Sequence, residues 1–200
     1  ESPDDDSLAE CNKKQNLHRD LVADVKRIQR AGLQVQGGFI IGFDNDTPSI
    51  FQRQIDFIQK SGIVTAMVGL LQAPIGTRLY KRMKQDGRLL GSFSGDNVDG
   101  ATNIIPKEMD MDILRMGYRA VVKTLYSPKN YYERVKTFLK EYKAPKITVP
   151  LKGEYITAFF RSVVRLGIIG KERAQYWKLV FWTLFRRPER VQRTKTLHRH

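Results

Sequence analysis

Two short polar loops hold the groups best suited to binding a ligand, and each loop comes directly after an apolar run. Residues 44–47 follow the run at 35–43, and residues 72–77 follow the run at 63–71. Pro74 and Gly76 favour a tight turn, whose backbone amides can donate hydrogen bonds to a ligand. We therefore predict that the second loop contacts a ligand largely through its main-chain groups.

The segments around these loops follow the order strand, loop, helix, strand, loop, helix. Strands are predicted at residues 35–43 and 63–71, and helices at 49–61 and 78–84. Thr47 and Pro48 form a cap and first-turn pair for the first of these helices. Parallel βα units bind their ligands at the C-terminal ends of the strands. We therefore expect both loops to belong to one site.

The remainder of the chain is predicted to be helical. Upstream helices are expected at residues 4–16 and 19–30, and strand patterns vanish beyond about residue 105. Helices are then expected at 109–126 and 127–142, followed by a linker with two prolines at 143–150 and a helical hairpin at 153–168 and 171–186. The chain thus divides into a βα region at residues 1–105 and a mostly α-helical region at residues 106–200.

Composition limits the class of protein. Among 200 residues, 41% are apolar, which suffices for a core. Cys11 is the single cysteine, so neither an internal disulfide nor a four-cysteine metal site can form, which fits a reducing compartment. The sequence has no apolar run of about 18 residues, and its acidic start is unlike a signal peptide. We expect a cytoplasmic protein and assign no metal ligand.

The net charge of +14 is concentrated near the C-terminus. Residues 151–200 hold 12 Lys and Arg against three acids, a balance of +9. Such a surface attracts an anionic membrane or an acidic partner protein, although it is also compatible with a solvated helical face. Aromatic residues alternate with these cations (Tyr176, Trp177, Phe181, Trp182 and Phe185). They favour either docking at the membrane surface or packing against the 153–168 helix. Nucleic acid is not expected, because no reader motif accompanies the charges.

Three motifs in order resemble the later half of a radical S-adenosylmethionine (SAM) barrel, and most closely the cobalamin-binding-domain class of that family. They are Glu1-Ser2-Pro3, Gly38-Phe39-Ile40-Ile41-Gly42-Phe43 and Ala73-Pro74-Ile75-Gly76-Thr77-Arg78-Leu79-Tyr80. The helical part, with Tyr126-Ser127-Pro128 and Tyr176-Trp177-Lys178, resembles the uncharacterised C-terminal region of these proteins. The resemblance covers essentially the whole chain.

The resemblance implies an α/β fold in which a partial (βα) barrel fragment with few parallel strands precedes the helical region. It also implies SAM and a [4Fe–4S] cluster as cofactors of the full-length protein, with cobalamin depending on an upstream domain. The reaction class would be that of an iron–sulfur oxidoreductase or a methyltransferase. The three-cysteine loop that holds the cluster is absent from this sequence. The isolated chain is therefore expected to be inactive, with no cofactor firmly bound.

The resemblance also assigns site residues, none of them catalytic. Glu1 corresponds to an acidic residue near the ribose and amino-acid part of SAM, and Gly38, Ile40 and Gly42 to a strand that packs against adenine. The turn residues correspond to a loop that meets SAM or substrate (Gln72, Pro74, Gly76 and Thr77). Each has a structural alternative, namely a frayed terminus, glycines that ease sheet packing, or a plain turn. Asp96, Asn97 and Asp99 form a loop that either covers substrate or is simply solvated.

The expected partners follow from this incomplete barrel. The upstream half of the same barrel would pair with the first strand. Without it, an exposed strand edge favours pairing with a second copy and thus a homodimer.

Overall fold

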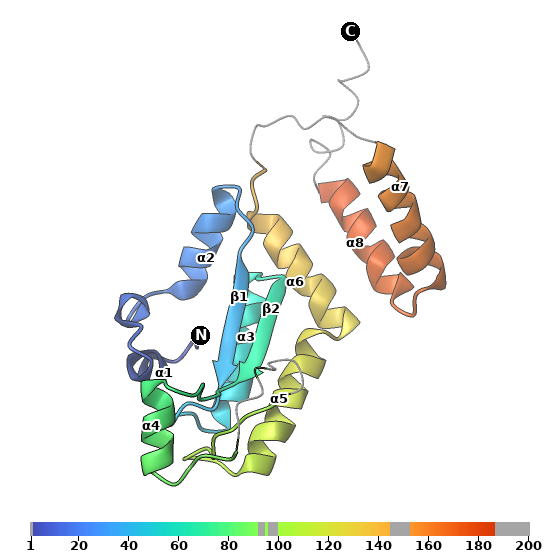
Figure 1. The fold of residues 1–200 in the computed structure, drawn as a ribbon. Helices are drawn as coiled ribbons and strands as arrows, with labels where there is room; N and C mark the ends of the chain where they lie inside the picture. Colours follow the sequence, from blue (N-terminus) through green and yellow to red (C-terminus); the bar gives the residue numbers. More distant parts are fainter. Residues whose placement is uncertain (1, 92–94, 96–99, 145–152, 187–200) are drawn as a thin grey trace. The chain divides into compact units, whose positions relative to one another are not determined.

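The computed structural model describes residues 2–91, 95, 100–144 and 153–186. The chain forms two compact units, Glu1–Ala144 and Pro145–His200 (Figure 1). The boundary between these compact units, after Ala144, is separate from the predicted change of sequence character near residue 105. The reason is that the two helices after residue 105 pack onto the helix between the two strands.

A βαβ element forms the centre of the first unit. Strands β1 (Gln36–Ile41) and β2 (Thr65–Leu70) pair in parallel, in a register that runs from Gln36 opposite Thr65 to Ile41 opposite Leu70. Helix α3 (Ser49–Ser61) connects them and ends at Gly62, whose φ of 72° is left-handed. These strands and this helix confirm the predicted order. The described residues contain two strands in this sheet, which establishes a mixed α/β fold.

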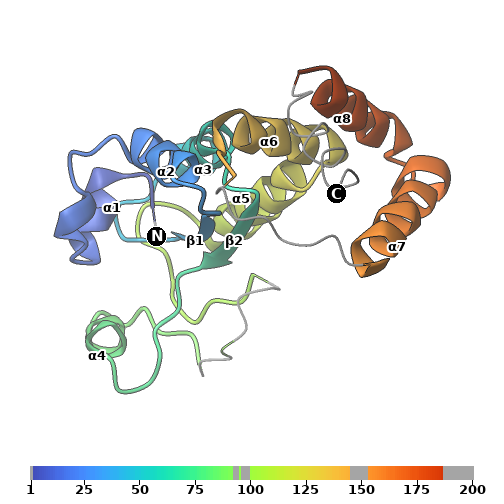
Figure 2. The ribbon, with the colours of Figure 1, turned by 90° about the horizontal axis from the view of Figure 1, so that it is seen from above.

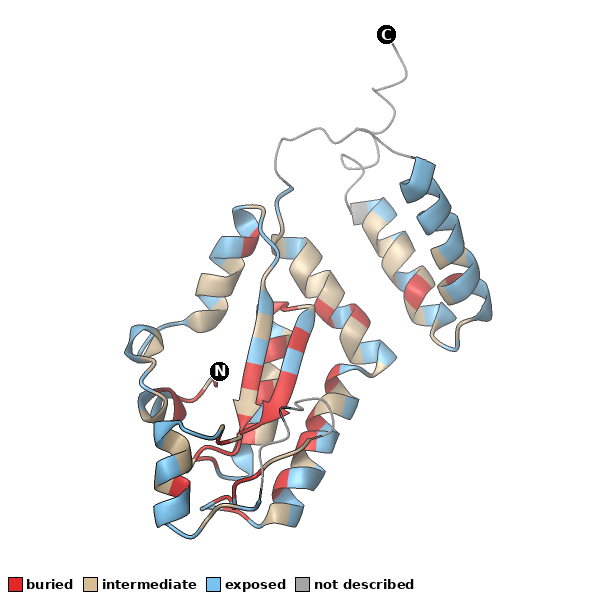
Figure 3. Ribbon diagram, in the orientation of Figure 1, coloured by how far each residue is buried: buried red, intermediate tan, exposed pale blue. Residues whose placement is uncertain are grey.

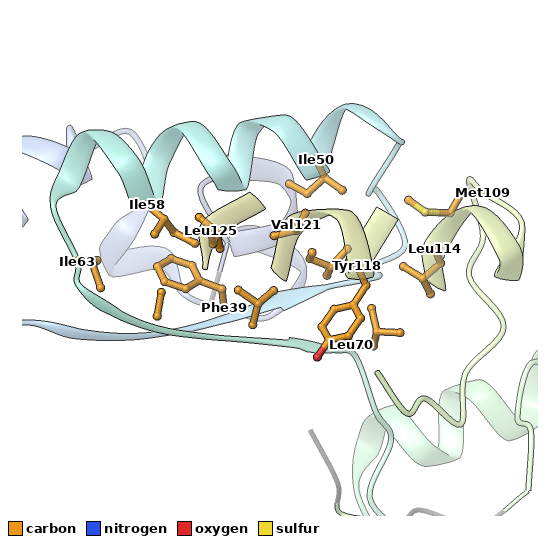
Figure 4. Packing of buried hydrophobic residues seen from close by; sticks show 13 residues of the cluster. Phe39, Ile50, Ile58, Ile63, Leu70, Met109, Leu114, Tyr118, Val121 and Leu125 are labelled. Atoms are coloured by element: carbon orange, nitrogen blue, oxygen red, sulfur yellow. The ribbon is translucent and has the colours of Figure 1, made fainter. Parts of the chain in front are cut away.

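Four helices cover one face of the sheet: α2 (Leu21–Arg30), α3, α5 (Met111–Leu125) and α6 (Pro128–Glu141). Figure 2 shows all four on the same side of the strands. Because side chains alternate along a strand, one set faces these helices and is buried (Phe39, Ile41, Ala66, Val68 and Leu70). The whole set belongs to one core cluster with Ile50 and Ile58 of α3 and Val121 and Leu125 of α5, and Figure 4 shows Phe39 and Leu70 on the side of the strands where these helices lie. Among the described residues of the first unit, no comparable helical layer covers the opposite face of the sheet.

Arg134 ties the helical layer to the start of β2. Its side chain is buried, and its Nη1 donates to Gln59 Oε1 and to the Leu125 carbonyl, both at 2.8 Å. Its Nη2 donates to the Val64 carbonyl at 3.2 Å. Burial lowers the pKa of this guanidinium. One cation thus joins α6, α3, the C-terminus of α5 and the entry to β2.

Side chains also bond to the outer edges of both strands. In a parallel pair of strands, every second residue directs its N–H and C=O groups toward the partner strand. The hydrogen bond from Leu71 N to the Ile41 carbonyl shows which residues of β1 and β2 do so. The Ile40 and Ala66 carbonyls therefore point outward. Gln54 Nε2 donates to the first at 3.0 Å, and the Tyr126 hydroxyl to the second at 2.6 Å. Each outer edge thus has at least one carbonyl already bonded.

A smaller cluster lies at the C-terminal ends of the strands, and α4 (Arg78–Gln85) packs against it. Its buried members are Phe43, Leu71, Ala73, Met83 and Ile104. At the N-terminal end of the unit, α1 (Asp5–Glu10) and a short 3₁₀ helix (Lys14–Asn16) replace the single helix expected at residues 4–16. The break occurs at Asn12, whose φ of 59° cannot continue a right-handed helix.

The second unit is a helical hairpin, as predicted. Helix α7 (Gly153–Ser162) continues into a π-helix, η2 (Val163–Ile169), and α8 (Arg173–Arg186) returns along it. Tyr176 and Trp177 of α8 approach Gly167 so closely that a Cβ there would lie 3.1 Å from the tyrosine ring. Trp177 Nε1 donates to the Gly167 carbonyl at 2.9 Å. Glycine at this position is what allows the two helices to meet.

Candidate functional site

A cleft of about 630 Å³ opens beside the sheet and collects half of the predicted site residues. Gly38, Ile40, Gln72 and Pro74 line it, together with Met67, which is exposed. Residues of β1, β2 and the loop after β2 line it, and three side chains of α5 reach it from the helical layer (Tyr118, Val122 and Tyr126). A cleft of this volume matches the size of common small-molecule sites.

Gly38 leaves open space in this cleft. A Cβ built on Gly38 would meet nothing within 4 Å, whereas one on the neighbouring Gly37 would lie 2.6 Å from the Phe39 ring. Gly37 is therefore required by packing inside the protein. No such requirement acts on Gly38 within the described residues, so its lack of a side chain keeps the cleft open.

The other predicted residues of the described chain lie outside the cleft lining. Gly42 has a φ of 107° and turns the chain out of β1. Gly76 has a φ of 87° in the loop after β2. Thr77 is the N-cap of α4, where its Oγ1 accepts from Tyr80 N at 3.1 Å and donates to the Pro74 carbonyl at 2.7 Å. Here the three residues shape the two loops that border the cleft. Glu1, Asp96, Asn97 and Asp99 lie outside the described residues.

Asp46 holds the loop after β1 in place. Its Oδ2 accepts from Gly42 N at 2.8 Å and Phe43 N at 3.1 Å, and its Oδ1 accepts from Ser7 Oγ at 2.8 Å. Burial raises the pKa of Asp46 above its ordinary value, and these hydrogen bonds offset that only in part. In the sequence, Asp46 is one of the four residues of the polar loop at 44–47. Its link to α1, 39 residues away, had no signal in the sequence.

Asn103 performs the equivalent task for the loop after β2. Its Oδ1 accepts from Ala73 N at 2.8 Å, and its Nδ2 donates to the Ala73 carbonyl at 2.9 Å. The adjacent Thr102 Oγ1 donates to the Leu71 carbonyl at 2.6 Å. The segment after α4 thus returns to the strand ends and fixes the turn that carries Gln72 and Pro74.

A second cavity, of about 400 Å³, lies at the C-terminal ends of the strands and shares Ile40 and Leu71 with the first. Charged side chains from distant segments line it, namely Glu10, Arg78 and Arg82. Arg82 Nη2 lies 2.8 Å from Glu10 Oε1 and 3.2 Å from Asp44 Oδ2. The bond to Glu10 raises the pKa of the Arg82 guanidinium. Sequence reasoning missed this group, because its members are brought together only by the fold.

The residues present do not fit an iron–sulfur cluster. A cluster needs several thiolate ligands, and Cys11 is the single cysteine of the chain. In the described part of the chain, no three His, Cys, Asp or Glu side chains lie close enough together to hold a metal ion. What the site offers instead is an apolar cleft with amide and main-chain polar groups at one end, an arrangement suited to an organic ligand.

The relatives of the chain include proteins named as methyltransferases. An uncharacterised methyltransferase of Synechocystis sp. (strain PCC 6803) is 32% identical over the whole chain, which spans 38% of that protein. The hopanoid C-2 methylase of Rhodopseudomonas palustris is 34% identical over half of the chain and 19% of its own length. The bacteriochlorophyllide d C-12(1)-methyltransferase of Chlorobaculum tepidum is 34% identical over half of the chain and 21% of its own length.

The chain thus spans less than two fifths of each of these relatives. A family model, described as a domain of unknown function (DUF4070), matches residues 77–199. That match includes α4 and every helix that follows it. Since it extends over more than half of the sequence, the chain belongs to the DUF4070 family.

Proposed function

We propose that this chain is the C-terminal part of a radical SAM methyltransferase, and that the open face of its sheet forms one wall of the pocket for SAM and substrate. The observation that carries the proposal is the cleft itself. It gathers Gly38, Ile40, Gln72 and Pro74, which are four of the residues that the resemblance to radical SAM barrels assigns to this pocket. The relatives named as methyltransferases support the reaction class.

The geometry suggests a role for each part of the cleft. The space above Gly38 and Ile40 suits a flat ring such as adenine, because no Cβ intrudes at Gly38. Gln72 and Pro74 lie at the end of β2, where amide and carbonyl groups can orient a polar part of the ligand. SAM would supply the methyl group. Glu1 would contribute a carboxylate near the ribose, and Gly42, Gly76 and Thr77 would hold the loops.

The proposal places the reactive half of the site upstream of this chain. The cluster ligands, and any cobalamin, would come from the preceding part of the protein, so the chain alone would be inactive. The upstream half of the barrel would pair with the outer edge of β1.

The test uses the full-length protein that contains this chain, purified without oxygen and with its iron–sulfur cluster reconstituted. With a reductant present, we expect it to consume SAM and release 5′-deoxyadenosine or S-adenosylhomocysteine, both measured by mass spectrometry. The chain of residues 1–200 serves as the control and should leave SAM intact. A full-length protein that carries its cluster and still leaves SAM unchanged would contradict the proposal.

A further inference from the structure

The helical hairpin of residues 153–186 leaves most of its apolar side chains uncovered by its own helices. Among residues 153–185, whose exposure the structure describes, only Gly167 and Tyr176 are buried. Figure 3 shows the hairpin mostly in the colours of exposed and intermediate residues. Phe159 and Phe160 of α7 and Phe181 and Phe185 of α8 are all more than half exposed, and Phe185 is 81% exposed. Of the aromatic residues that alternate with cations in the sequence, Tyr176 is thus buried within the hairpin, whereas Phe181 and Phe185 are exposed.

The exposed apolar side chains follow the helix period. Ile156, Phe160 and Val164 are four residues apart, a spacing that places neighbours on one face of a helix. Phe181 and Phe185 have the same spacing in α8. Each helix therefore presents a stripe of large apolar groups that the other helix does not cover.

Cations accompany these stripes. Arg161 directly follows Phe160, Arg165 follows Val164, and Lys178 precedes Phe181 by one turn. Among the described residues, no acidic side chain forms an ion pair with any of these three cations. The sequence after Phe185 adds six more Lys and Arg against one acid. The hairpin thus combines exposed aromatic groups with positive charge that its own acids do not neutralise.

We propose that this hairpin docks on an anionic lipid bilayer, with its apolar stripes at the headgroup boundary and its cations on lipid phosphates. Amphipathic helices that lie in the interface combine these same features, namely Phe, Trp and Leu on one face and Lys and Arg beside it. The cations stand beside apolar groups on both helices instead of gathering in one patch, which favours a lipid surface over an acidic protein. No helix in the described ranges is long and apolar enough to cross a membrane, so the contact is with one surface.

The experiment uses the full chain with vesicles of phosphatidylglycerol and phosphatidylcholine, and with vesicles of phosphatidylcholine alone. The chain's two tryptophans, Trp177 and Trp182, both lie in α8 and act as reporters. We expect their emission to shift to shorter wavelengths with the anionic vesicles, and co-sedimentation to give the affinity. Added salt should weaken the binding, because surface charges are screened.

Two pairs of variants separate docking from general effects. Arg161→Gln with Arg165→Gln should weaken binding by about 30-fold, since each cation near an anionic surface contributes about 1 kcal/mol. Arg115→Gln with Arg119→Gln removes the same charge at the same spacing from α5 and should change binding less than about threefold. Phe160→Ser should weaken binding about tenfold. Met116→Ser should not, although Met116 is 62% exposed and Phe160 is 63% exposed.

The proposal is overturned by equal binding to both kinds of vesicle, or by equal losses in the two variants of each pair. It is also overturned if anionic vesicles leave the tryptophan emission unchanged while light scattering shows a dimer that Phe160→Ser abolishes. That result would assign the apolar stripes to a second copy. Circular dichroism of each variant checks that the hairpin is folded, so a loss of binding with unchanged helix content supports the docking role.

Discussion

Replacement of Asp46 tests how the loop after β1 is held. Alanine would leave the buried main-chain N–H groups of Gly42 and Phe43 without their acceptor, and would leave the Ser7 hydroxyl with only its longer bond to Asp4 Oδ2, at 3.3 Å. Each unsatisfied buried group costs about 1–3 kcal/mol, so we expect Asp46→Ala to lower the free energy of unfolding by about 3 kcal/mol at pH 7. Asp46→Asn keeps one oxygen for the two amides and an NH₂ group for Ser7. It should therefore cost about 1 kcal/mol or less.

The difference in stability between Asp46→Asn and the wild type should change with pH in a definite direction. Burial raises the pKa of Asp46 above its ordinary value. A carboxyl group with a higher pKa in the folded state contributes stability that is fully present below its unfolded pKa, about 3.9, and is lost as the pH rises through the folded value. Asparagine carries no such charge. Between pH 4 and pH 7, the stability of Asp46→Asn relative to the wild type should therefore increase.

Urea denaturation followed by far-UV circular dichroism measures these changes. Tryptophan fluorescence provides an internal control, because both tryptophans lie in the second unit and their transition should not move. Asp110→Ala serves as the matched variant, since Asp110 is exposed and caps α5 without a side-chain hydrogen bond. It should cost less than about 1 kcal/mol. The reasoning is refuted if Asp46→Ala lowers the free energy of unfolding no more than Asp110→Ala does. It is also refuted if the stability of Asp46→Asn relative to the wild type decreases between pH 4 and pH 7.

Three further predictions concern the first unit. Arg134→Met should lower the free energy of unfolding by about 3 kcal/mol, because three acceptors lose their donor; a loss below about 1 kcal/mol in urea denaturation would contradict this. Gly62→Ala should destabilise more than Gly76→Ala in the same assay. Both glycines have positive φ, but only at Gly62 would the Cβ lie 2.9 Å from Phe138 N, and equal losses would count against that contact. Because no further strand among the described residues pairs with β1, we expect light scattering to give twice the chain mass of 23.1 kDa, and a monomer mass would exclude the edge-strand dimer.

Local patterns predicted the elements of this fold well. The apolar runs gave rise to β1 and β2, and Gly62 ends α3 where the sequence suggested. Helix spacing also predicted α5 and α6. The partner of these helices could not be predicted, because an apolar stripe shows that a face is buried but not against what. Their packing on α3 places both helices in the same compact unit as the two strands.

The candidate site was predictable only where it follows the strands. Gly38, Ile40, Gln72 and Pro74 share the cleft because parallel strands bring their ends together. The charged group around Arg82 depends on a contact with Glu10, 72 residues away, for which neither residue carries a local signal.

The most direct test of the central claim is the affinity of the full-length protein for SAM in two valine variants of β1. In Gly38→Val, the new side chain would extend into the cleft. Its Cβ would have no other atom within 4 Å, so the free energy of unfolding should not change. Gln36→Val, two residues earlier on the same face of the strand, lies outside the cleft lining. If the open face of the sheet is a wall of the SAM pocket, Gly38→Val should weaken SAM binding by about tenfold or more, since a loss of about 1.4 kcal/mol is tenfold, and Gln36→Val should leave it unchanged. Equal affinities in the two variants would contradict the claim.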